Sequence, residues 1–183
     1  GKLVAQTSAA DRVMEVLRPE KIEKLGEGRY RIDFGEEISG WVHLHDVTGE
    51  AGQRIDIRYL CESPNGSNSY TMRGGAPESY HTRFTWYVFR EVEIDGWPSE
   101  LSPGQITAEA VYTDVSSTGR FECSNPLFNR INRIWRRSQT DNMHGCIASD
   151  CPHRERSAYT GDGQVACVTV MHNFDAAAFY SKW

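Results

Sequence analysis

The sequence predicts an antiparallel β-sandwich followed by a group of helices. From about residue 12 to residue 114, apolar and polar residues alternate in short runs that end at Gly, Pro, Asn or Asp. Such runs are typical of strands that bury one face. After Gly119 the apolar residues recur every three or four positions, which is the spacing of one helical face. We therefore expect a β-sandwich over residues 1–117 and helices over residues 118–183.

Four runs are expected to be strands of the sandwich. Two of them alternate apolar residues with charged ones, and two are rich in aromatic and β-branched residues. The expected strands lie in residues 30–34, 41–44, 55–59 and 84–89. Two clusters of turn residues, 63–68 and 73–77, predict a long loop between two strands.

Three helices are expected after the sandwich. The first should begin at Pro126, with Ser124 or Asn125 as its N-cap. Its apolar face consists of Leu127, Phe128, Ile131, Ile134 and Trp135. The second helix is predicted from about residue 162 to 172, and the third from Asp175 to Trp183. Helices with such large apolar faces need further partners, so a larger helical domain is expected beyond Trp183 and the chain looks truncated.

Composition excludes some classes of partner. The content of 39% hydrophobic and 25% charged residues is that of an ordinary folded protein. A formal net charge of -5 disfavours nucleic acid, because phosphate binding needs clustered Lys and Arg. No apolar run is long enough for a transmembrane helix, so a membrane partner is not expected. Oligomeric state and cellular compartment are left open.

The five cysteines do not predict a disulfide framework. Their number is odd and their spacing shows no repeat. They are Cys61, Cys123, Cys146, Cys151 and Cys167.

Chemically versatile residues gather in the segment from Asp150 to Gln164, between the first two expected helices. It contains three carboxylates, two arginines, a tyrosine and an imidazole, with few apolar residues. Loops on rigid helices commonly carry sites. An inverting glycosidase needs one protonated carboxylic acid and one carboxylate that activates water. A solvated salt-bridge network is the alternative interpretation of the same residues.

The sign of any pKa shift in this segment is left open. Asp150 and Asp162 would raise the pKa of Glu155 by like-charge repulsion, whereas Arg154 and Arg156 would lower it.

The motif Asp150-Cys151-Pro152-His153-Arg154-Glu155-Arg156, followed by Tyr159 and then Thr160-Gly161-Asp162, resembles the signature of the bacterial α-L-rhamnosidases, glycoside hydrolase family 78. Other parts of the chain resemble that family in the same order, so the resemblance covers nearly the whole chain. They are residues 33–35, 40–41, 84–92, 111–114, 118–125, 173–175 and 179–183.

The resemblance implies a fold and a set of roles. The fold is a jelly-roll-like β-sandwich followed by the first helices of a truncated (α/α)6 barrel. Glu155 is then the general acid that protonates the leaving oxygen. The residues implied to hold or line the sugar are Asp150, Arg154, Tyr159 and Asp162. The general base is a Glu later in the barrel, so no position here is assigned to it and the fragment alone is expected to be inactive.

The sequence departs from the family pattern at three positions. Ser157-Ala158 stands where the family often has Leu-Gly, and Tyr159 stands where it commonly has Trp. These differences alter the surface that faces the sugar. The implied activity is inverting hydrolysis of terminal α-L-rhamnosyl linkages, with a rhamnose-containing glycoside or polysaccharide as partner and no cofactor.

Several alternatives stay open. A zinc site could use His144, Cys146, Cys151 and His153, although their spacing is unusual, and we expect no metal. Packed thiols are the simpler interpretation of Cys146 and Cys151. A nucleophile pair of Cys151 and His153 is weaker still. Asp162 could instead cap its helix.

Two further alternatives concern the whole chain. The chain could be a non-catalytic carbohydrate-binding module, with Trp41, Trp86 and Phe89 as a platform, although packing in the sheet core is the simpler use of these rings. It could also belong to another inverting (α/α)6-barrel glycosidase with a different sugar.

Overall fold

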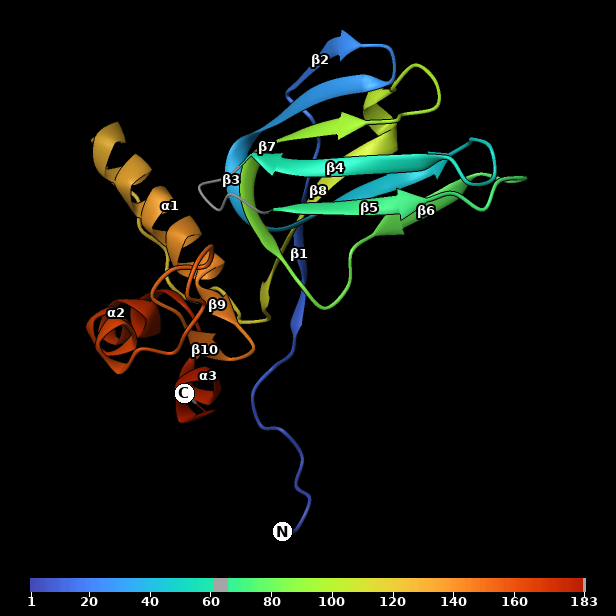
Figure 1. Cartoon of the computed structure of the whole chain (residues 1–183). Coiled ribbons are helices and arrows are strands. Elements are labelled where there is room, and N and C mark those ends of the chain that lie inside the picture. Colours follow the sequence, from blue (N-terminus) through green and yellow to red (C-terminus); the bar gives the residue numbers. More distant parts are fainter. Residues whose placement is uncertain (61–65, 183) are drawn as a thin grey trace. The chain divides into compact units, whose positions relative to one another are not determined.

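The structure is a computed structural model that describes residues 1–60 and 66–182. Cys61, the turn residues 63–65 and Trp183 lie outside the described residues. The chain forms two compact units, one of residues 13–110 and one of residues 1–12 together with the chain from Val111 onward. Figure 1 shows the strands and helices that make up these units.

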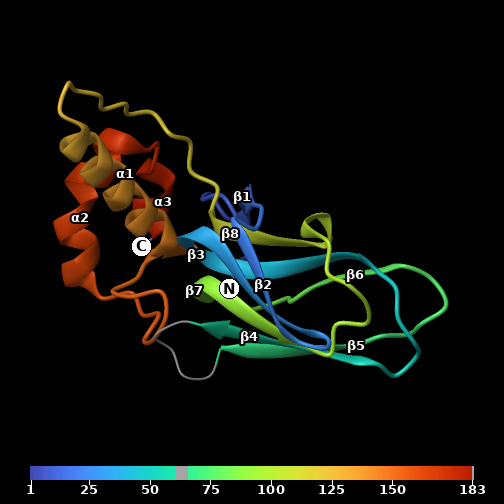
Figure 2. The ribbon, with the colours of Figure 1, turned by 90° about the horizontal axis from the view of Figure 1, so that it is seen from above.

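An eight-stranded sheet dominates the structure, with the strand order β1-β8-β3-β7-β4-β5. Two more strands, β2 and β6, pair with β3. The pairs formed by β2 to β8 are antiparallel, and the sheet curls, as Figure 2 shows. The strands are β1 (Asp11–Leu17), β2 (Lys21–Gly26), β3 (Arg29–Val47), β4 (Arg54–Leu60), β5 (Ser67–Thr71), β6 (Glu78–His81), β7 (Tyr87–Asp95) and β8 (Ile106–Thr113). The expectation of an antiparallel, strand-rich region before the helices is confirmed.

Strand β3 joins two of the expected strands into one strand of 19 residues. Its first part pairs with β2 and β7, and its last part pairs with β8 and β6. The register with β7 shifts between Asp33 and Ile38, and Gly35 lies between them with φ of 80°. Such an irregularity bends a strand without ending it. The bend lets β3 curl through the sheet.

The buried face follows the alternation in the sequence. Tyr30, Ile32 and Phe34 are buried, as are the alternating residues Ile55, Ile57 and Tyr59 of β4. The ring of Phe89, fully buried on β7, lies 6.1 Å from that of Phe34 and 4.8 Å from that of Tyr59, measured between centroids. Burying such a ring contributes about 1.5–3 kcal/mol.

The expected strand over residues 84–89 was wrong in its first half. Strand β7 begins only at Tyr87, and Phe84 is fully exposed with φ of 63°. A left-handed backbone does not continue a strand, so the aromatic run is divided between a loop and a strand.

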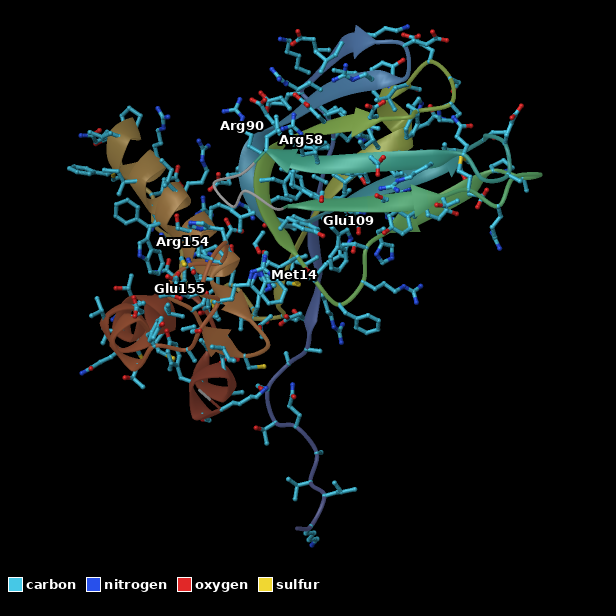
Figure 3. All side chains as sticks on the ribbon, in the orientation of Figure 1. Met14, Arg58, Arg90, Glu109, Arg154 and Glu155 are labelled. Atoms are coloured by element: carbon cyan, nitrogen blue, oxygen red, sulfur yellow. The ribbon has the colours of Figure 1, made fainter. Side chains whose placement is uncertain are left out.

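The outer face of the sheet carries paired charges. Glu93 on β7 bonds to Arg31 on β3 at 2.6 Å and to Arg58 on β4. Arg90 holds both carboxylate oxygens of Asp33 at 2.8 Å. Figure 3 labels Arg58 and Arg90. Because most of these groups are exposed, each pair stabilises the sheet by less than about 1 kcal/mol.

The single long loop predicted from the turn clusters 63–68 and 73–77 was wrong, because strand β5 (Ser67–Thr71) lies between them. The loop that joins β5 to β6 is closed by one buried carboxylate. Glu78 accepts hydrogen bonds from the hydroxyl of Tyr70, from the backbone N–H of Gly74 at 2.9 Å and from that of Arg73 at 3.2 Å. The Tyr70 hydroxyl, despite some opposing desolvation, lowers the pKa of Glu78 to about 2. The loop therefore depends on the ionised form of Glu78.

We expect the loop to loosen in acid. A carboxyl with a lowered pKa contributes stability that is present above its ordinary pKa of 4.5 and is lost as the pH falls through about 2. The amide proton shift of Gly74, followed by NMR, should titrate in that window. In Glu78→Gln it should not move there. A titration of Gly74 that survives this substitution would contradict the assignment.

The helices occupy the other unit. They are α1 (Pro126–Asp141), α2 (Thr160–Asn173) and α3 (Ala177–Lys182). The start of α1 is confirmed, because Asn125 is its N-cap and its side chain accepts a hydrogen bond from the backbone N–H of Leu127 at 3.0 Å. The core of this unit includes Met143, Val170, Phe174 and Phe179. No helix in the described part of the chain is long and apolar enough to span a membrane.

The predicted apolar face of α1 is largely exposed. Leu127, Phe128, Ile131 and Ile134 are each more than half exposed, whereas Trp135 packs against the core. Helix α2 likewise exposes Val165 and Val168. These faces are more apolar than solvent-facing helix surfaces usually are.

Candidate active site

The candidate site follows a small hairpin that the sequence did not predict. Strands β9 (Met143–His144) and β10 (Ile147–Ala148) pair in antiparallel register. The two turn residues, Gly145 and Cys146, have φ of 60° and 62°. Two positive φ angles are the requirement of a type I′ hairpin turn, for which Asn-Gly is the usual signal. Gly145-Cys146 lacks that signal, which explains why the hairpin was missed.

This hairpin is anchored inside its own unit. The carboxylate of Asp11 accepts hydrogen bonds from the backbone N–H of Gly145, at 2.9 Å to each oxygen. His144 Nδ1 lies 3.7 Å from Asp11 Oδ2. The buried thiol of Cys146 donates to the carbonyl of Ala9 at 3.0 Å. His144 and Cys146 thus have structural uses.

The zinc interpretation gains no support. Among residues 1–60 and 66–182, one group of three or more potential ligands lies within 4.8 Å, and it consists of Asp150, Cys151 and Glu155. The histidines of the zinc interpretation are not part of it.

The segment between β10 and α2 folds back on itself. Ser149 begins it and is fixed by two bonds to Asn142, from its backbone N–H at 3.0 Å and from its hydroxyl at 2.9 Å. The backbone N–H of Asp150 points to the carbonyl of Ser157 at 3.4 Å, and Arg156 has φ of 54°. This reversal brings the start and end of the motif together.

Glu155 lies at the surface of the folded segment. Its side chain is 44% exposed and accepts a hydrogen bond from the Cys151 thiol, with Sγ 2.8 Å from Oε2. Arg154 Nε lies 3.7 Å from the same oxygen, and Figure 3 labels both residues in this segment. The Cys151 thiol is the main group that holds the pKa of Glu155 below its ordinary value. The backbone N–H of Glu155 and the Arg154 guanidinium also lower this pKa, whereas the Asp150 carboxylate raises it.

Asp150 lies beside Glu155 with one oxygen in use. Its Oδ2 lies 3.4 Å from the Cys151 sulfur, within hydrogen-bond distance. Its Oδ1 is buried and meets no hydrogen-bond partner of good geometry in the described part of the chain. Burial raises the pKa of Asp150, but the backbone N–H and the thiol of Cys151 outweigh it, so the pKa is lowered. A buried oxygen without a donor is suited to accept a ligand hydroxyl.

The other expected site residues lie nearby in sequence, on the segment and on α2. Arg154 has a side chain that is 68% exposed. Tyr159 is the N-cap residue of α2 and is 51% exposed. Asp162 lies in the first turn of that helix, exposed, and makes no hydrogen bond or ion pair with the residues that the structure describes. Because Tyr159 occupies the N-cap position, the capping role suggested for Asp162 was wrong.

Cys151 is not the packed thiol that the sequence suggested. It is half-buried and its sulfur lies within hydrogen-bond distance of two carboxylates, whereas Cys146 belongs to the hydrophobic core of the unit. The signal available in the sequence was the spacing of Cys151 and Glu155 on either side of Pro152. It did not reveal which way the thiol points.

The aromatic platform of the alternative binding module is only partly present. Phe89 is buried in the sheet. Trp41 is on the outer face, where its ring stacks on His81 at 5.3 Å and its Nε1 donates to Glu109 at 2.6 Å. The prediction that these rings pack in the sheet core is therefore confirmed for Phe89 and wrong for Trp41. The second oxygen of Glu109 is bonded to His43 at 2.6 Å.

Two family models of known proteins match this chain. The family model described as the bacterial alpha-L-rhamnosidase 6 hairpin glycosidase domain matches residues 116–183. The model described as the bacterial alpha-L-rhamnosidase concanavalin-like domain matches residues 61–112. The chain belongs to the bacterial α-L-rhamnosidase family. The resemblance in the motif and this membership are therefore in agreement.

Relatives within the family are similar over the whole chain. An α-L-rhamnosidase of Formosa agariphila is 32% identical over 98% of this chain and 20% of its own length. The solved α-L-rhamnosidase of Dictyoglumus thermophilum has a TM-score of 0.92 and 32% identity over 100% of this chain and 22% of its own. That of Streptomyces avermitilis, complexed with L-rhamnose, has a TM-score of 0.89 and 29% identity over 99% and 19%. The chain thus spans about a fifth of these relatives.

Proposed function

We propose that the protein containing this chain hydrolyses terminal α-L-rhamnosyl linkages with inversion, and that Glu155 is its general acid. The observation that carries the proposal is the exposed Glu155 carboxyl, held beside the buried, unpaired oxygen of Asp150. A proton donor must reach the leaving oxygen, and a neighbouring acceptor must hold a sugar hydroxyl. The pair supplies both groups.

The remaining residues complete a sugar-holding surface in this proposal. Asp162 projects from the first turn of α2 and, being exposed, can accept hydrogen bonds from hydroxyls. Arg154 lies against Glu155 and donates to oxygens of the same sugar. The half-exposed ring of Tyr159 covers an apolar sugar face. No cofactor is required, because acid, base and water complete an inverting hydrolysis.

Substrate binding must raise the pKa of Glu155. The Cys151 thiol holds the pKa of this carboxyl low in the unliganded chain. A sugar placed over the carboxyl excludes water, and desolvation raises a carboxyl pKa. Substrate binding therefore raises the protonated fraction of Glu155 relative to the unliganded chain.

The apolar helix faces support a proposal for the architecture. We place a domain boundary near residue 118 and regard α1 to α3 as the first helices of an (α/α)6 barrel. The exposed residues Leu127, Ile131 and Val165 then pack against further helices of that barrel. Two helices of this kind need such partners to bury their faces.

The function can be tested with the intact protein and a natural α-L-rhamnoside. We expect release of L-rhamnose, and the β-anomer should appear first in a time course followed by proton NMR, before mutarotation. Initial release of the α-anomer would overturn the inverting mechanism. Release of a different sugar, with none from the rhamnoside, would overturn the substrate.

A further inference from the structure

We propose that Cys151 is a positioning residue for Glu155: its thiol holds one carboxylate oxygen while the proton leaves from the other. This inference rests on the proposed function of Glu155. It assigns a role to a side chain that contacts the acid directly, with Sγ 2.8 Å from Oε2.

The contacts divide the two oxygens of Glu155. The Cys151 thiol bonds to Oε2, and Arg154 Nε lies 3.7 Å from the same oxygen. Oε2 is therefore the oxygen that the protein holds. We place the transferable proton on Oε1, which leaves the thiol contact undisturbed when the proton moves.

The backbone of the segment makes this contact. Residues 152–155 form a turn in which Pro152 is buried, and this turn brings Glu155 back over Cys151. The same thiol reaches Asp150 Oδ2 at 3.4 Å. The Cys151 sulfur thus lies within hydrogen-bond distance of the proposed acid and of a proposed sugar-holding residue, and its single S–H donates to the nearer oxygen, Oε2 of Glu155.

A thiol in this place acts most strongly during proton transfer. As Glu155 gives its proton to the glycosidic oxygen, negative charge develops on the carboxylate. A hydrogen bond to an ionised acceptor is stronger than one to a neutral acceptor. The contact therefore stabilises the transition state more than the bound substrate, and its loss lowers kcat more than it changes KM.

The thiol also sets the upper pH limit of the reaction. Among the described residues, the side chains that influence the Glu155 carboxyl are the Cys151 thiol, the Arg154 guanidinium and the Asp150 carboxylate, and its own backbone N–H also lies against it. The thiol and the guanidinium lower the pKa of Glu155, and Asp150 raises it. The alkaline limb of kcat/KM reports the pKa of the acid in the free enzyme. Removal of the thiol should therefore move that limb to higher pH.

The test compares three variants of the intact protein on a rhamnoside with a poor leaving group. Cys151→Ala should lower kcat about threefold to tenfold at the pH optimum, with KM within about twofold of the wild type. Its alkaline limb should lie at higher pH. Cys151→Ser should restore both properties toward the wild type, because a hydroxyl also donates. The control Cys123→Ala removes another half-buried thiol, one that bonds to the Asn125 carbonyl, and should change neither.

A chemical modification covers the case in which Cys151→Ala does not fold. Methyl methanethiosulfonate converts a thiol to its methyl disulfide and releases methanesulfinate, so the S–H donor is lost from the folded enzyme. Activity should fall and the alkaline limb should move to higher pH, and dithiothreitol should reverse both. The Cys151→Ser enzyme should not respond.

Three outcomes overturn the inference while the wild type is active on the rhamnoside. They are an unchanged kcat and pH profile in Cys151→Ala, a loss in Cys151→Ser as large as that in Cys151→Ala, and a change confined to KM. A wild type that releases no rhamnose overturns the proposed function itself. The two failures are therefore distinct.

Discussion

Glu155→Gln should reduce kcat on a natural rhamnoside by a factor of about 10²–10⁴, the usual contribution of a positioned general acid. Glutamine has nearly the shape of glutamate and lacks the transferable proton. The carboxyl is 44% exposed, so the substitution leaves no buried cavity. The loss should therefore come from chemistry and not from unfolding.

The loss of activity in Glu155→Gln should depend on the leaving group of the substrate. An aryl rhamnoside with a good leaving group needs little protonation, so Glu155→Gln should retain much more of its activity on that substrate. The residual activity should also lack the alkaline limb of the wild type. Both measurements need only initial rates of the intact protein as a function of pH.

The matched control is Glu122→Gln. Glu122 is an exposed glutamate of the same unit, and its partner is Arg120 at 2.8 Å. This variant should keep wild-type rates on both substrates. If Glu155→Gln retained wild-type kcat on the natural rhamnoside, Glu155 would not be the acid.

Local chemistry explains which elements could be predicted from the sequence. The pair Asn125-Pro126 predicts a helix start because a short side chain caps the first turn and proline needs no N–H there. The alternation around Ile32 and Ile57 predicts strands because successive side chains point to opposite faces. Each of these signals acts within a few residues.

Longer-range features were not predictable in the same way. The continuity of β3 depends on a register shift against β7 around Gly35, and a glycine in the sequence equally suggests a strand end. The turn at Cys146 depends on bonds from Asp11 to the neighbouring Gly145, more than 130 residues away. Such contacts outweigh the weak local preference against a positive φ.

The candidate site shows the same division. Asp150 and Glu155 were expected together because only four residues lie between them in a short segment. The direction of the Glu155 pKa was left open, because opposing charges surround it in the sequence. The structure assigns the largest influence to the neutral Cys151 thiol, which lowers the pKa. A balance of charges could not have revealed that contribution.

Asp162→Ala should weaken the binding of L-rhamnose about tenfold to a hundredfold, measured by calorimetry on the intact protein. The estimate follows from the strength of a hydrogen bond to a charged acceptor. Asp162 is exposed in the first turn of α2 and has no bonded partner among the described residues, so its loss removes a ligand contact and little else. A carboxylate at this helix position adds a small favourable term to the fold, which the control must share.

Asp175→Ala supplies that control, because Asp175 is an exposed aspartate just before α3 in the same unit. It should bind L-rhamnose as the wild type does.

The alternative of a sheet-borne binding module makes the opposite prediction. Binding on the sheet would survive Asp162→Ala and be lost in Trp41→Ala, which removes an exposed-face ring already engaged by His81 and Glu109. We expect Trp41→Ala to bind normally, since the Trp41 ring face on His81 and its Nε1 are both in use within the sheet. Loss of binding in Trp41→Ala alone would assign the sugar to the sheet, and the segment from Asp150 to Asp162 would then be a structural network of charges.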